Sequence, residues 1–305
     1  AGIATSFGLG VSQICGGLDY LFGIERTNQT MLTIIMLVTM VFIVSAITGV
    51  YKGIKILSNL NTYIALALLI IVFIVGPKIT ILNNLTNSVG LHIQYMVKDL
   101  FMTNAFGDNS WIMNWRVFYY AWFVAWTPFV GMFLARISKG RTVREFIVGV
   151  VIVPSIFTII WLAVFSAIAL ASVKGWDVAS VQRLVTSPET AVFIVFSKYP
   201  LAKLISLMII NLLAIFFITS ADSATYSLSV MTSNGNIAPP TYKKVTWGVV
   251  VAAIAYILLS AGSLKPLQVI SIAASLPFLF VMIAMMPAIL KEMRRDKKVQ
   301  KNREG

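Results

Sequence analysis

Long apolar stretches separated by short polar segments dominate this chain. Eight such stretches occur, at 1–22, 31–50, 63–76, 113–135, 146–171, 204–229, 247–261 and 267–290. A helix needs about 20 predominantly apolar residues to cross a bilayer, so 63–76 and 247–261 need a few flanking residues to span. The pattern predicts an all-α polytopic membrane protein with about eight transmembrane helices. Because the first stretch begins at residue 1 without an initiator Met, we expect the chain to be the later part of a longer protein.

Two connecting segments have patterns of their own. Residues 84–106 place Leu91, Ile93 and Leu100 among polar residues, a spacing that fits an amphipathic helix lying along the membrane surface. Residues 175–200 fit two interpretations equally, an extracellular lid or hairpin and a plain connector. We expect one transmembrane domain over 1–305, with apolar groups at 1–83 and 113–290, an amphipathic linker at 84–112 and a basic tail at 291–305.

Composition and charge agree with a membrane protein. Hydrophobic residues make up 58% of the chain and charged residues 11%, whereas a soluble domain carries about 25% charged residues. If the first stretch runs outward from the cytoplasm, 15 of the 24 Lys and Arg fall in cytoplasmic segments. The net charge of +13 then records insertion topology rather than nucleic-acid binding. This topology predicts a plasma-membrane protein with a cytoplasmic C-terminus, whose basic tail also suits anionic lipid.

The first stretch is rich in small and polar residues. Four glycines, Gly8, Gly10, Gly16 and Gly17, give it a face on which neighbouring helices can approach closely. We therefore expect this helix to be central in the bundle. Its polar side chains then face protein or a cavity, or simply bond to their own backbone; they are Thr5, Ser6, Ser12 and Gln13.

The chain offers little to an enzyme. Cys15, the single cysteine, is expected to be a small buried hydrophobe, and His92, the single histidine, to be a surface residue. One thiol cannot build a disulfide or metal framework. No nucleophile–base pair or metal cluster is visible, so we expect no catalytic residues, no cofactor and no enzyme activity.

An aromatic stripe marks the stretch 113–135. Its six rings recur at helical steps of four and three residues, as Trp115, Tyr119, Trp122, Trp126, Phe129 and Phe133. Helix packing is one interpretation. The other is a cage of ring faces around a quaternary ammonium, which donates no hydrogen bonds and is held by cation–π attraction worth about 2 kcal/mol or more when dry. Pro128 and Gly131 loosen the helix just beyond the stripe.

The stretch FFITSADSATYSLS, residues 216–229, crowds polar groups into an otherwise apolar span. Asp222 is a carboxylate at membrane depth, which is a functional hypothesis by default. Hydroxyls and backbone carbonyls are hard oxygen ligands that suit a dehydrated alkali cation in an ion-coupled transporter. The alternative is a hydrogen-bonded cluster that holds helices together.

Three segments resemble one known family. WRVFYYAWFVAWTPFVGMFLARISKGRTVREF, residues 115–146, resembles the signature region of the betaine/choline/carnitine transporters, which reads approximately W-T-x-F-Y-W-A-W-W-x-x-W-S-P-F-V-G followed by F-x-A-R-I-S-x-G-R-T-x-R-E-F. ATSFGLGVSQICGGLDYLFGI, residues 4–24, resembles the family's fifth helix, and ITSADSATY, residues 218–226, its tenth. The likeness covers essentially the whole chain, from the fifth helix to the C-terminal tail.

The resemblance implies a fold and a function. The fold is the inverted-repeat transporter fold of five plus five helices, with the last three helices of the first repeat in 1–83 and the second repeat in 113–290. The function is import of a quaternary-ammonium osmolyte, with glycine betaine the first candidate and choline or carnitine the others. The coupling ion is Na⁺ or H⁺, and Na⁺ is favoured because residues 1–22 and 216–229 contain no Lys or Arg.

The resemblance also implies site residues. The substrate rings map to Tyr119, Trp122, Phe123 and Trp126. The Na⁺ ligands map to Phe216, Thr219 and Ser220, with Thr5 and Ser6 near a second ion site. Family members are often trimeric, so we expect a homo-oligomer.

Departures from the family pattern leave alternatives open. Tyr120 and Phe123 stand where Trp is usual, and Arg116 stands where Thr is common. The family's third and fourth helices, which complete its substrate and ion sites, have no counterpart in the chain. Two alternatives are therefore an inactive truncated transporter and a membrane osmosensor without flux.

Overall fold

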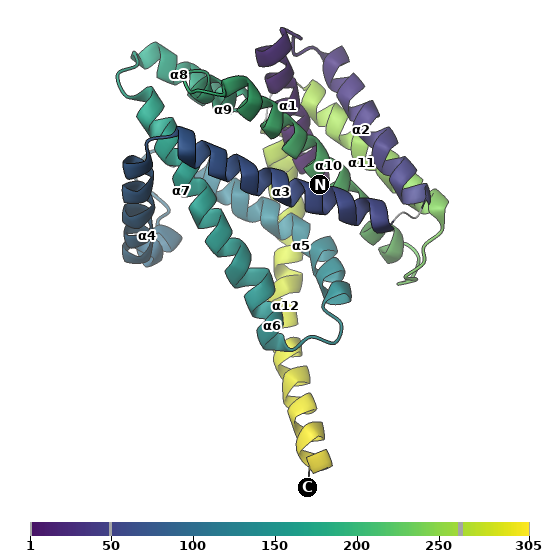
Figure 1. Cartoon of the computed structure of the whole chain (residues 1–305). Helices are drawn as coiled ribbons and strands as arrows, with labels where there is room; N and C mark the ends of the chain where they lie inside the picture. The colour runs from purple at the N-terminus through teal and green to yellow at the C-terminus, as the bar shows by residue number, and fades with distance from the viewer. Residues whose placement is uncertain (1, 49–50, 262–264, 305) are drawn as a thin grey trace.

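The computed structural model describes residues 2–48, 51–261 and 265–304, and in this part the chain is helical without strands, as the hydrophobic pattern predicts. The helices are α1 (Gly2–Phe22), α2 (Asn28–Thr48), α3 (Tyr51–Val75), α4 (Lys78–Phe101), α5 (Phe118–Ile137), α6 (Val143–Ile147), α7 (Val153–Val173), α8 (Val178–Thr186), α9 (Pro188–Phe196), α10 (Ala202–Met231), α11 (Thr241–Ser260) and α12 (Lys265–Glu304) (Figure 1). Two π-helical turns, η1 (Ile112–Val117) and η2 (Val148–Ile152), lead into α5 and α7.

Six helices in the described residues are long and apolar enough to cross a membrane. They are Lys55–Val75, Ile112–Ile137, Val143–Val173, Ala202–Met231, Thr241–Ser260 and Lys265–Arg295, and they match six of the eight predicted spans. The other two predicted spans are also helical. Glycines and polar residues lower the mean hydropathy of α1, and the apolar part of α2 that is described, Asn28–Val44, is shorter. The chain is a multi-pass membrane protein.

Helix α1 is central, as its small-residue face predicts. Neighbouring side chains lie so close to three of its glycines that a Cβ there would come within 3 Å of them: Leu267 of α12 at Gly8, Phe217 of α10 at Gly10, and Phe193 of α9 at Gly17. Cys15 is buried, as expected, in an apolar cluster formed by α1, α2, α10, α11 and α12. The glycines therefore let side chains of three neighbouring helices pack directly against the backbone of α1.

A second apolar cluster joins α3, α4, α7, α9 and α10. Within it, α4 packs on α7, where the Asn84 side-chain amide donates to the Ala163 carbonyl at 2.9 Å and to Ser166 Oγ at 3.0 Å. The amphipathic helix predicted over 84–106 is thus present with different bounds. It begins at Lys78 because Pro77, which lacks an N–H, suits a helix start and ends at Phe101, after which Met102 is extended. His92 is exposed on it, as predicted.

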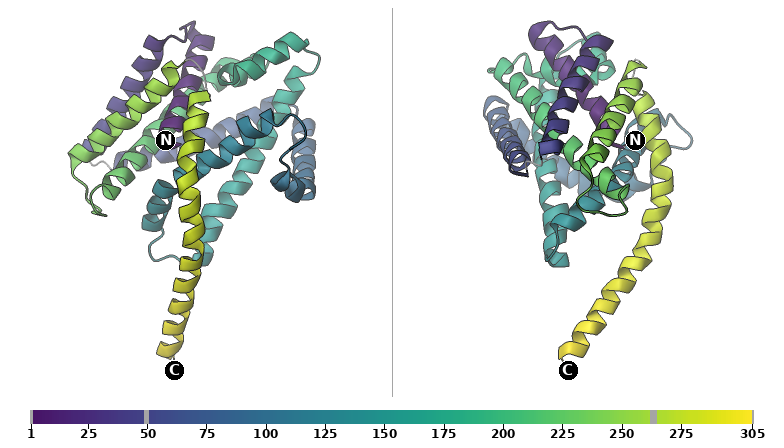
Figure 2. Two further views of the ribbon diagram at one scale, coloured as in Figure 1. Left: turned by 180° about the vertical axis from the view of Figure 1, so that it is seen from behind. Right: turned by 90° about the vertical axis from the view of Figure 1, so that its right-hand side faces the viewer.

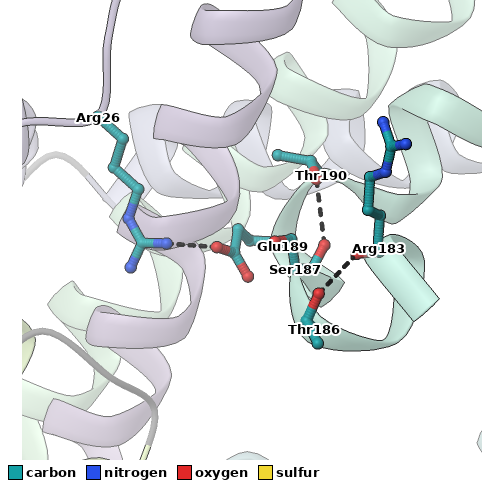
Figure 3. A network of polar contacts seen from close by, with 6 residues as sticks. All are labelled: Arg26, Arg183, Thr186, Ser187, Glu189 and Thr190. Atoms are coloured by element: carbon teal, nitrogen blue, oxygen red, sulfur yellow. Dashed lines mark hydrogen bonds and ion pairs between the residues drawn. The ribbon is translucent and has the colours of Figure 1, made fainter. Parts of the chain in front are cut away.

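The segment 175–200 contains two short helices in series, α8 and α9, joined at Ser187. Whether this segment acts as a lid or as a plain connector stays a prediction. Asp177 caps α8 by accepting from the Ser180 hydroxyl and backbone N–H, and these hydrogen bonds hold the pKa of Asp177 below its usual range. Helix α9 lies against α1, with the Tyr20 and Phe193 rings stacked 6.0 Å apart. Glu189 forms an ion pair with Arg26 of the α1–α2 loop (Figure 3). The α8–α9 segment is thereby fastened to the end of α1.

Helix α12 is the longest element, and its C-terminal part projects away from the other helices (Figure 2). Its N-terminal part packs along α5. Gln268 Nε2 also donates to the carbonyl of Asn114 in η1 at 3.0 Å. The side chains of 296–305, which include most of the basic tail, lie outside the described residues, so the expected contact of this tail with lipid stays a prediction.

Candidate functional site

Three helices line a partly open cavity of about 340 Å³, in which Phe123 is 69% and Phe216 52% exposed. Helix α1 contributes one wall, α5 the aromatic wall and α10 the third. The lining side chains and glycine are Ser6, Leu9, Gly10, Gln13, Trp122, Phe123, Trp126, Leu213, Phe216 and Phe217. Five of the nine predicted site residues therefore share one cavity: Ser6, Trp122, Phe123, Trp126 and Phe216.

Hydrogen bonds to α1 orient the two tryptophans of this wall. Trp126 Nε1 donates to the Gly2 carbonyl at 2.9 Å. Trp122 Nε1 donates to the same carbonyl at 3.2 Å and to Ser6 Oγ at 3.0 Å. Both indole N–H groups thus bond to α1, while both rings line the cavity. The Cβ of an alanine at Gly2 would lie 2.7 Å from the Trp126 ring, so the close approach depends on glycine.

Other rings of α5 pack against the two cavity tryptophans. Phe129 is buried against Trp126, with ring centroids 4.9 Å apart, and Phe118 stacks on Trp122 at 5.7 Å. Tyr119, a predicted substrate residue, does not line the cavity. It is 44% exposed, and its ring meets Trp122 edge-on at 5.7 Å. Packing thus accounts for part of the stripe, and the cage of rings around a cation stays a prediction for the part that lines the cavity.

The predicted ion ligands of α10 lie next to the cavity. Phe216 lines it, and the Thr219 hydroxyl, one turn further along, donates to the carbonyls of Ile215 and Phe216 at 3.0 and 3.1 Å. Ser220 follows on the same turn and is half-buried. Asp222 is buried, with 8% of its surface exposed. The polar groups of this stretch are therefore arranged along one helix beside the aromatic wall.

Thr5 and Ser6 point to different neighbours. The Ser6 hydroxyl donates to the Gly2 carbonyl at 3.0 Å and lies at the cavity. The Thr5 side chain is fully buried against α12, within hydrogen-bond distance of Ser271 Oγ at 2.7 Å and of the Leu267 carbonyl at 3.2 Å. Adjacent residues of a helix lie about 100° apart around its axis. Ser6 therefore faces the cavity while its neighbour Thr5 faces α12.

Sequence reasoning did not assign Gly10, Leu9, Leu213 and Phe217 to the site. Phe217 is 5% exposed and lies directly on Gly10. The signal in the sequence was the glycine pair at 8 and 10, which predicts close approach but does not identify the approaching side chain. Only the packing of α10 on α1 identifies it.

A cationic cluster lies around Tyr226, four residues beyond Asp222 on α10. The Arg136 guanidinium, at the end of α5, is 4.8 Å from the centre of the Tyr226 ring. Lys244 Nζ, at the start of α11, is 5.8 Å from the same ring. The basic segments after α5 and at the start of α11, both expected to be cytoplasmic, therefore meet at one residue. Arg26 and Glu189 join two segments that are expected on the other side of the membrane.

Comparison with known proteins identifies relatives along the whole chain. The sequence model described as BCCT, betaine/carnitine/choline family transporter, matches residues 1–298. A glycine betaine transporter, OpuD of Bacillus subtilis (strain 168), is 42% identical over 98% of this chain and 59% of its own length. An ectoine/hydroxyectoine transporter of Virgibacillus pantothenticus is 34% identical over 99% of this chain and 61% of its own. The chain thus spans about three-fifths of the length of these curated relatives.

Proposed function

This chain belongs to the betaine/carnitine/choline transporter family, and we propose that it carries the aromatic part of the substrate site in a secondary transporter that imports a quaternary-ammonium osmolyte. Glycine betaine is the first candidate, and choline and carnitine are the others. The observation that carries the proposal is the cavity in which Trp122, Phe123 and Trp126 present their rings. Such rings attract a trimethylammonium group, which has no hydrogen to donate.

We further propose Na⁺ as the coupling ion, with H⁺ as the alternative. Phe216, Thr219 and Ser220 would supply oxygen ligands beside the cavity, in the position expected of a site coupled to substrate. Ser6, at the cavity, and Thr5, on the α12 side, remain candidates for a second ion site. The absence of Lys and Arg from α1 supports an added cation, because no fixed positive charge there replaces it.

The orientation is part of the proposal. Arg136 and Lys244 meet at Tyr226, which supports placing the end of α5 and the start of α11 on one side of the membrane. Positive segments stay cytoplasmic during insertion, so this side is assigned to the cytoplasm, together with the C-terminal tail. The tail would then contact anionic lipid, in a homo-oligomer that we expect to be a trimer.

Radiolabelled glycine betaine uptake tests the function. Cells that lack their own osmolyte importers would express either the 305-residue chain or the longest polypeptide encoded by its native gene (the parent polypeptide), with and without Na⁺. We expect Na⁺-dependent accumulation by the parent polypeptide. Equal accumulation with and without Na⁺ would contradict Na⁺ coupling and favour H⁺ as the coupling ion. Binding without accumulation of betaine, choline or carnitine would contradict transport and favour an osmosensor.

Removing the hydroxyls of the proposed ion site should change ion dependence more than maximal rate. In the parent polypeptide, Thr219→Ala combined with Ser220→Ala is expected to raise the Na⁺ concentration for half-maximal betaine uptake at least about tenfold, since two of the ion's oxygen ligands disappear. Ser197→Ala is the matched control, because its hydroxyl donates to the Ile194 carbonyl in α9, away from the cavity. An unchanged Na⁺ dependence would mean that both hydroxyls serve helix structure only.

A further inference from the structure

The polar lining of the cavity is small and most of it is already hydrogen-bonded. Apart from the indole N–H groups, the lining side chains with polar atoms are Ser6 and Gln13. Both indole N–H groups bond to α1. The Ser6 hydroxyl accepts from Trp122 and donates to the Gly2 carbonyl. Ser6 therefore orients the aromatic wall, and its hydroxyl proton is already donated to a backbone carbonyl.

Gln13 differs from Ser6 in this respect. Its side chain lines the cavity and is half-buried, and within the described residues it makes no hydrogen bond. A primary amide carries two N–H donors and one acceptor oxygen. A half-buried amide beside an apolar chamber needs a partner, because an unsatisfied polar group is costly to desolvate. The amide is thus available to a ligand.

Its position relative to the rings matches a two-ended ligand. Gln13 stands seven residues after Ser6, which is about two helical turns, or roughly 10 Å along α1. Ser6 marks the level of Trp122 through their hydrogen bond. The ring faces and the amide therefore lie at different levels of α1 along one cavity. Leu9 and Phe217, which also line it, offer only hydrocarbon side chains, and Gly10 has no side chain.

We propose that Gln13 is the residue that selects the carboxylate end of a zwitterionic substrate. The proposal rests on the proposed function and names the substrate class of the same cavity: a quaternary ammonium joined by a short carbon link to a carboxylate. The rings attract the cationic end. The carboxylate has acceptors only, so the Gln13 amide N–H groups are its complement. Choline ends in a hydroxyl instead and forms a weaker hydrogen bond, because bonds to charged groups are stronger.

Two substitutions with opposite electrostatics test this assignment in the parent polypeptide. Gln13→Leu removes the donors and keeps much of the bulk, whereas Gln13→Glu places a negative charge where the carboxylate would lie. Uptake of radiolabelled glycine betaine and of radiolabelled choline would be measured for each, corrected for the amount of protein in the membrane. Ser12→Ala, one residue away and also on α1, is the control, since Ser12 is buried and does not line the cavity.

We expect Gln13→Leu to raise the KM for betaine at least about tenfold and to leave the KM for choline within about threefold. Gln13→Glu should reverse the preference, because its charge repels the zwitterion's carboxylate and attracts net-cationic choline. Equal losses for both substrates in both variants would overturn the assignment of Gln13, and so would a betaine KM of Gln13→Leu within twofold of wild type. In either case, uptake by the wild type would still support the transporter. If the wild type accumulates none of betaine, choline and carnitine, the proposed function fails and this inference fails with it.

Gln13→Asn provides a second measurement in case Leu or Glu prevents folding. It keeps both amide donors and shortens the side chain by one methylene. We expect betaine to lose more affinity than choline. Unequal losses in this direction support the assignment, and equal losses contradict it. Quenching of tryptophan fluorescence by each solute in purified protein gives the same comparison without transport, because Trp122 and Trp126 line the cavity.

Discussion

Alanine at Gly10 is expected to abolish uptake and to lower the thermal stability of the protein by several degrees. The Cβ would lie 1.6 Å from Cε2 and 1.9 Å from Cζ of Phe217, far inside van der Waals contact. The ring cannot swing aside easily, since Phe217 is 5% exposed and meets Phe7 edge-on at 5.2 Å. Helix α10 must therefore move away from α1, which separates two walls of the cavity. Overpacking of this kind typically costs 1–3 kcal/mol.

A matched alanine distinguishes this clash from the general effect of replacing a helical glycine. Gly131→Ala on α5 meets nothing within 4 Å and improves helix propensity by about 1 kcal/mol, so its stability should equal or exceed that of the wild type. Thermal unfolding of the purified parent polypeptide and betaine uptake would be measured for both variants. A second-site change, Gly10→Ala with Phe217→Leu, should restore part of both. Wild-type uptake by Gly10→Ala alone would show that the helices are not held at this distance.

Replacing Trp126 by leucine is expected to reduce betaine uptake at least about tenfold. The substitution removes one ring face from the cavity, and a dry cation–π contact is worth about 2 kcal/mol, which corresponds to roughly a thirtyfold change in affinity. It also removes the 2.9 Å hydrogen bond to the Gly2 carbonyl, which orients the ring. Both losses act on substrate affinity, so the KM should rise more than the maximal rate falls.

Two further variants separate the cage from packing. Trp126→Phe keeps a weaker ring and loses the N–H, so it should fall between leucine and wild type. Phe133→Leu lies seven residues further along α5, outside the cavity lining, and should leave uptake within twofold. The initial rate of radiolabelled betaine uptake across a range of concentrations gives both constants. If leucine at position 126 stays within twofold of wild type, the aromatic stripe serves packing alone.

Much of the fold was predictable because the hydrophobicity of each segment decides whether that segment forms a membrane-length helix. Six predicted spans recur as membrane-length helices, and the glycines of α1 identified the central helix. Bounds were less predictable. Helix α4 begins at Lys78 rather than 84 and ends at Phe101 rather than 106, because the break at Gly76 and Pro77 and an extended Met102 decide its ends. The hydrophobic pattern does not specify such breaks.

The cavity itself depended on contacts between residues far apart in the chain. The aromatic stripe predicted a face of rings, but Tyr119 is on that stripe and outside the cavity, because α1 meets α5 at Gly2 and Ser6. Gln13 was visible as a polar residue in an apolar helix. Only the packing shows that Gln13, and not Thr5, lines the cavity, because one side of α1 faces α5 and α10 and the other side faces α12.

The sequence by itself determined the class of the molecule, the number and order of most spans, the central role of α1 and the ring-bearing helix, because hydrophobicity and helical period act within short segments. Tertiary structure alone decided which rings turn toward the cavity, that Phe217 lies on Gly10, and that Thr5 and Ser6 serve different neighbours. These are properties of the crossings between α1, α5, α10 and α12. Such crossings depend on the side chains of two helices together, and no single segment encodes them.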